Sequence, residues 1–84
     1  MNRFEEAAAA AAAQLGASAL RELAARIAAG WPDQAILGAG GQCFGDAATP
    51  VLAARTETGV PDADAAAHLR GLAAGHQHVT TASP

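Results

Sequence analysis

The chain has 84 residues, of which 51% are hydrophobic, and its eight Asp and Glu residues outnumber five arginines, with no lysine, for a formal net charge of −3. A chain of this length forms one domain at most and buries only about 60–65% of the surface that its unfolded form would expose. Generic nucleic-acid binding requires a basic surface, so this charge balance argues against it. Much of the apolar content is alanine, which buries little area. We therefore expect a thin hydrophobic core.

The first helix is predicted over residues 3–15, where nothing interrupts helix formation and alanine, the best helix former, dominates. Glu5 and Glu6 stand in its first turn, where carboxylates interact favourably with the helix dipole. Its amphipathic pattern is weak. This acidic start and the short alanine run match neither a signal peptide nor a membrane span.

The second helix is predicted over residues 19–29, with Ser18 as its N-cap. Its apolar residues recur at i, i+3, i+4 and i+7, which places them on one face. They are Leu20, Leu23, Ala24 and Ile27. Gly30 ends this helix at the C′ position, and Trp31 followed by Pro32 supports that end because proline disfavours helical backbone in the preceding residue.

The middle of the chain carries weaker signals. Residues 34–37 suit a short helix or a short strand, and we predict a short helix. The glycine-rich segment 38–45 that follows predicts a loop.

Two further helices are predicted in the second half. The first has Thr49 as N-cap, Pro50 at N1 and Gly59 at C′. The second is capped by Asp62 and ends at Gly75, and the polar residues 76–84 are expected to fray.

These elements predict an all-α fold, a small bundle of four to five short helices with a glycine-rich central loop. One small helical domain is expected over residues 1–79, with a flexible tail over 80–84. The core is expected from the larger apolar side chains. They are Leu15, Leu20, Leu23, Ile27, Trp31, Ile36, Leu37, Phe44, Leu52, Val60, Leu69 and Leu72. Because so thin a core gives marginal stability, we expect the domain to dock on a partner or to belong to a longer polypeptide.

The candidate chemical groups form no complete catalytic motif. His76 and His78 are separated by one residue and could face one metal ion, but no carboxylate or thiolate near them in sequence completes a zinc site. We expect His68, His76 and His78 to be exposed to solvent. Cys43 is expected to pack as a small hydrophobic residue rather than act as a nucleophile, and a single cysteine without an internal disulfide is typical of a cytoplasmic protein. We assign no catalytic, cofactor-binding or metal-ligating residue and expect no cofactor.

The glycine-rich segment contains Gly40-Gly41-Gln42, the tripeptide of peptide-chain release factors, but the residues that follow and the lack of a basic surface do not fit that class. It is not a phosphate-binding P-loop either, because the chain has no lysine.

Residues 52–72 have the outline of a helix-turn-helix. Asp62 and Asp64 would lead its second helix into the major groove and place carboxylates against phosphates, which argues against DNA recognition. We favour an αα-hairpin packed on the apolar face of residues 20–27. A small stand-alone regulator that uses this hairpin to bind DNA or protein is the alternative.

Three segments together carry a family resemblance: residues 19–32 (ALRELAARIAAGWP), 51–55 (VLAAR) and 62–75 (DADAAAHLRGLAAG). They resemble the N-terminal helical region of actinobacterial phospholipase D-like proteins of the DISARM anti-phage system. In that family the chemistry is performed downstream by two His-x-Lys-x4-Asp motifs, which a chain without lysine cannot contain.

The resemblance therefore implies a cytoplasmic bacterial, non-catalytic docking module that leads a phospholipase D-like defence protein. Its expected partner is another protein or an adjacent catalytic domain, with no membrane and no nucleic acid. Its small alanine faces would also permit self-association.

Overall fold

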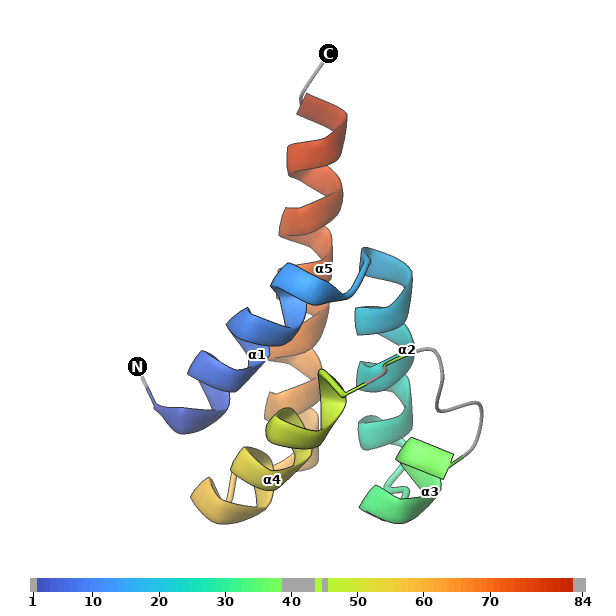
Figure 1. The fold of residues 1–84 in the computed structure, drawn as a ribbon, viewed down its shortest axis with the longest axis vertical. Helices are drawn as coiled ribbons and strands as arrows, with labels where there is room; N and C mark the ends of the chain where they lie inside the picture. Colours follow the sequence, from blue (N-terminus) through green and yellow to red (C-terminus); the bar gives the residue numbers. More distant parts are fainter. Residues whose placement is uncertain (1, 39–43, 45, 83–84) are drawn as a thin grey trace.

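A computed structural model describes residues 2–38, 44 and 46–82, and the side chains of all of these except 76–82. Within these residues the chain forms five α-helices and no strand (Figure 1), which confirms the all-α prediction. The helices are α1 (Arg3–Gln14), α2 (Ala17–Ala28), α3 (Asp33–Gly38), α4 (Ala48–Thr58) and α5 (Asp62–Ala82). Most of the predicted glycine-rich loop, residues 39–43 and 45, lies outside the described part.

The α1 helix begins with a reciprocal cap that the sequence analysis missed. The Asn2 side chain accepts a hydrogen bond from the Glu5 backbone N–H at 2.8 Å, and the Glu5 carboxylate accepts one from the Asn2 backbone N–H at 3.2 Å. This capping box satisfies two N–H groups that the helix itself cannot pair. An asparagine followed three residues later by a glutamate is its sequence signal.

The α1 helix buries one face, although alanine occurs on every side of it. Phe4, Ala8 and Ala11 are buried at positions i, i+4 and i+7, and Leu15 continues the same face beyond the helix end. The alanines hid this pattern because they occur on every face of the helix.

The α2 helix begins two residues before its predicted start. Gly16 is the N-cap, so Ser18 lies inside the first turn and makes no capping bond. The C-terminal end is as predicted: Gly30 has a φ of 80°. Its N–H donates to the Ile27 carbonyl at 3.0 Å, and the Trp31 N–H donates to the Arg26 carbonyl at 3.3 Å. These two bonds form a Schellman motif, which needs a left-handed residue at this position.

The α3 helix confirms the short helix predicted in the middle of the chain.

The α4 helix begins earlier than predicted. Its N-cap is Ala47, not Thr49, and the alanine side chain cannot accept a capping hydrogen bond. Pro50 is tolerated because the first four N–H groups of a helix have no partner within it. Gly59 ends the helix with a left-handed φ of 70°, as predicted.

The α5 helix continues past the predicted end at Gly75 to Ala82. Among the described residues only Gly30 and Gly59 have a positive φ, so Gly75 does not form a stop. Nothing in the alanine-rich sequence around it breaks the helix, which therefore propagates. Its C-terminal turns extend beyond the ends of α1 and α2 (Figure 1). No helix in the described part of the chain is both long and apolar enough to cross a membrane.

The core lies where α5 packs along α2 and where α1 packs on α4, with a smaller contact between α1 and α5 (Figure 1). The predicted hairpin is thus half correct, because α5 packs on the apolar face of α2 while α4 packs chiefly on α1. The largest buried side chains are Phe4, Phe44, Leu20, Leu23, Ile27, Ile36, Leu52, Leu69 and Val51. Of the predicted core, Leu37, Val60 and Leu72 are only half-buried and Trp31 is 40% exposed.

Two arginines form ion pairs between helices at the surface of this core. Arg55 of α4 donates to Asp33 of α3 at 2.8 Å and also pairs with Asp62 at the start of α5. Arg3 of α1 pairs with Glu57 of α4. Because the Arg55 side chain is only 16% exposed, this pairing is more strongly shielded from water than the one at Arg3.

Candidate functional site

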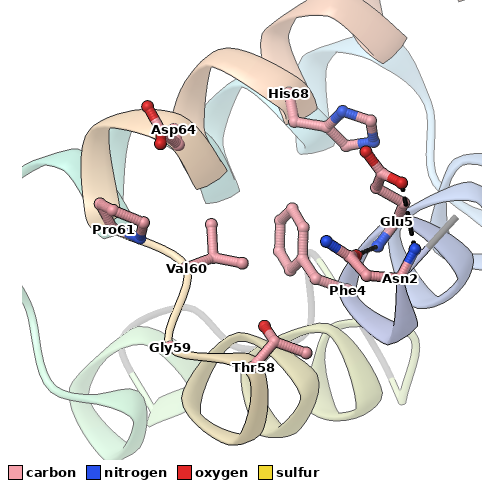
Figure 2. A pocket seen from close by; sticks show the side chains of 9 residues that line it. All are labelled: Asn2, Phe4, Glu5, Thr58, Gly59, Val60, Pro61, Asp64 and His68. Carbon is pink, nitrogen blue, oxygen red and sulfur yellow. Dashed lines mark hydrogen bonds between the residues drawn. The ribbon is translucent and has the colours of Figure 1, made fainter.

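A cavity of about 410 Å³ opens between the start of α1 and the turn that joins α4 to α5 (Figure 2). It is lined by Asn2, Phe4, Glu5, Thr58, Gly59, Val60, Pro61, Asp64 and His68. The capping box and the left-handed Gly59 position the two sides of this cavity. Both are local devices that keep the backbone in one conformation.

Phe4, Val60 and Pro61 are the apolar side chains that line the cavity. Phe4 is 2% exposed, and its ring contacts the His68 ring with a centroid distance of 5.7 Å and an interplanar angle of 59°. Tilted ring pairs at this distance are favourable. The half-buried Val60 lies beside Phe4 in the centre of Figure 2. Phe4 thus belongs to the core beneath the cavity, and the half-buried Val60 is more accessible.

The rim of the cavity is acidic. Glu5 and His68 lie on one side of Phe4 in Figure 2, and Asp64 lies on the other. Asp64 is exposed and makes no hydrogen bond or ion pair with the described residues. None of the nine lining residues is an arginine or a lysine. The two carboxylates are therefore not neutralised by a cation of the cavity itself.

The polar groups of the cavity suit binding better than nucleophilic chemistry. The Thr58 hydroxyl donates its hydrogen bond to the Ala54 carbonyl at 2.8 Å instead of to a base in the cavity. The described residues contain no group of three His, Cys, Asp or Glu side chains placed to hold a metal ion. The carboxylates of Glu5 and Asp64 are the charged groups that line the cavity.

No known protein family, curated protein or solved structure matches this chain.

A second candidate surface surrounds Trp31, the one exposed large hydrophobic side chain in the described part of the chain. The Arg26 guanidinium lies 5.6 Å from the centre of the Trp31 ring and 5.0 Å from that of the Phe44 ring. Arg26 also donates to Glu22 and to the Ile36 carbonyl, each at 2.9 Å. Four interactions thus fix the arginine on which the indole rests.

Of the candidate histidine and cysteine side chains, the structure describes only that of His68. His68 was expected to be exposed, but it is half-buried against Phe4. The side chains of His76 and His78, the whole of Cys43 and the segment 40–42 lie outside the described residues. Glu5 was predicted as a favourable charge in a first helical turn and Asp64 as a charge opposed to DNA recognition, and neither was grouped with His68.

Part of this grouping has a sequence signal. Asp64 and His68 are four residues apart on α5, a spacing that places two side chains on one helix face. The third member, Glu5, comes from the opposite end of the chain, and only the packing of α1 beside α5 brings it to the cavity.

Proposed function

We propose that this chain is a non-catalytic helical docking module that binds a protein partner, or an adjacent catalytic domain, through the surface around Trp31. The observation that supports it is the 40% exposure of the indole, while the other large apolar side chains of the described residues are buried or half-buried. Tryptophan is enriched among the residues that dominate binding energy at interfaces.

The surroundings of Trp31 reduce the conformational entropy that would be lost when it binds a partner. Its backbone is held by the Schellman motif and restricted by Pro32, and its ring rests on Arg26. An aromatic side chain that is already ordered loses little conformational entropy when it enters a partner's pocket. These features favour the interpretation that Trp31 contacts a partner over the interpretation that its exposure has no function.

The resemblance of residues 19–32, which include Trp31, supports a phospholipase D-like catalytic domain as the partner. The codons that follow Pro84 test this assignment. Two downstream His-x-Lys-x4-Asp motifs would support it, whereas a stop codon followed by an unrelated gene would remove its basis.

The docking role itself is tested by photocrosslinking in a lysate of the source organism. A photoreactive residue at position 29, which is exposed and next to the Trp31 surface, is compared with one at position 9, which is exposed on α1. We expect one protein to be captured repeatedly from position 29, and not from position 9 or after Trp31→Ala.

Binding of the captured protein is then measured with the purified chain. Because an interface tryptophan contributes about 2 kcal/mol or more, Trp31→Ala should weaken binding at least about 10-fold. Trp31 is the only tryptophan, so its fluorescence should shift to shorter wavelength on binding. An unchanged affinity would refute the proposal, and capture of a second copy of the chain would assign the surface to self-association instead.

A further inference from the structure

We propose that two copies of this chain associate weakly through α2 in an antiparallel pair, in which Trp31 of each copy enters a cavity on α2 of the other copy. The contact uses the surface proposed above for docking, so a partner that binds Trp31 would have to displace it. The inference goes beyond the docking role and concerns the purified chain alone, so the two can be tested separately.

The site that would receive the indole is a second cavity, of about 600 Å³, which we call the α2 cavity. It is lined by Gly16, Ser18, Ala19, Glu22 and Arg26. Its volume is within the range of small-ligand sites, so an indole ring has room in it. The residues at its N-terminal end have small side chains, and Ser18 makes no capping bond. A large flat side chain can therefore enter without displacing a group on which the fold depends.

The α2 cavity and Trp31 belong to one continuous surface because Arg26 contributes to both. Arg26 lines the cavity, and its guanidinium lies 5.6 Å from the centre of the Trp31 ring. Glu22, another lining residue, accepts a hydrogen bond from Arg26 at 2.9 Å, and its side chain is 51% exposed. One helix surface thus carries an exposed aromatic ring and a cavity on opposite sides of an ion pair.

The order of these features along α2 makes the surface complementary to itself. Trp31 lies five residues after Arg26, and residues 16–19 lie three to six residues before Glu22. In an antiparallel pair with each Glu22 opposite the other copy's Arg26, the same register places each Trp31 opposite residues 16–19 of the other copy. A two-fold contact requires such self-complementarity. The charges and the cavity therefore identify a second copy as the occupant.

The contact is small, so the association should be weak. A buried tryptophan accounts for about 150–250 Å², and two of them cover much less than the roughly 1,600 Å² of a standard interface. We expect a dissociation constant of about 0.01–1 mM. At the lower concentrations used for capture from a lysate, the chain is then monomeric and Trp31 is accessible to a partner.

Sedimentation equilibrium of the full chain between about 10 µM and 2 mM measures the association, and we expect monomers to convert to dimers. Trp31→Ala, at an exposed side chain, should weaken it at least about 10-fold. Ser18→Arg fills the α2 cavity and should weaken it by a similar factor although Trp31 is retained. Ala9→Arg adds the same charge on the exposed side of α1 and is the matched control, which should dimerise like the parent chain.

A mixture of two variants tests whether the indole enters the cavity of the other copy. Ser18→Arg keeps Trp31 and Trp31→Ala keeps the α2 cavity, so a mixed pair restores one of the two contacts. The mixed dimer should therefore form at least about threefold more tightly than either variant with itself. Because Ser18→Arg carries the only tryptophan in this mixture, its fluorescence should shift to shorter wavelength when Trp31→Ala is added.

A chain that stays monomeric at about 2 mM, a Ser18→Arg variant that dimerises like the parent, or a mixture without a fluorescence shift would overturn this inference. Each of these results would leave the docking role of Trp31 intact. Conversely, an unchanged partner affinity of Trp31→Ala would remove the docking role while dimerisation of the purified chain still stood.

Discussion

The packing of α1 on the rest of the bundle depends on Phe4, and Phe4→Ala is its sharpest test. The side chain is 2% exposed and contacts His68 of α5. Truncation of a buried phenylalanine costs about 3–5 kcal/mol. Because Phe4 lines a cavity that opens to solvent, water can enter the space it vacates. We therefore expect a cost near the lower end, about 3 kcal/mol.

A loss of this size would be large for the whole molecule. At about 0.05–0.15 kcal/mol per residue, the 84 residues have a total stability of roughly 4–13 kcal/mol. At roughly 4–8 °C per kcal/mol, the melting temperature should fall by at least about 12 °C. Urea unfolding followed by far-UV circular dichroism, with thermal melts beside it, measures both quantities.

Two controls distinguish packing from general damage to α1. Phe4→Leu keeps most of the apolar volume and should cost less than about 1.5 kcal/mol. Ala9→Ser lies on the exposed side of the same helix and should stay within about 0.5 kcal/mol of the parent chain. If Phe4→Ala costs less than about 1 kcal/mol, α1 does not dock through this residue.

Three further changes test local features of the fold by urea unfolding. Asn2→Ala removes the cap of α1 and should cost about 1 kcal/mol, whereas Asn2→Asp should retain most of the stability. Gly59→Ala forces a side chain into the left-handed conformation at a φ of 70° and should cost about 1–2 kcal/mol; a neutral result would mean that α4 ends elsewhere. Arg55→Leu leaves Asp33 and Asp62 without their partner and, since both carboxylates are partly exposed, should cost about 1–2 kcal/mol, less than a fully buried pair. Stability unchanged by Arg55→Leu would show that this ion pair does not hold α3, α4 and α5 together.

The helices and most of their ends follow from local sequence signals. Alanine-rich segments propagate as helices, and Gly30 and Gly59 stop them where a left-handed residue is needed. The apolar face of α2 was also readable, because its large side chains recur with the helical period. The errors at Ser18, Thr49 and Gly75 share one cause. Each residue can cap or stop a helix, but continuing the helix satisfies more backbone hydrogen bonds in alanine-rich surroundings.

The sequence alone thus determined the fold class, the order of the helices and the face of α2 that is buried. Only the tertiary structure decided that Phe4 is inside, that Trp31 is exposed and that Glu5 meets Asp64 at one cavity. Helix formation depends on neighbours within about four residues, which the sequence shows directly. Burial and the grouping of side chains depend on how helices distant in the chain stack, and in an alanine-rich chain many faces are equally able to make those contacts.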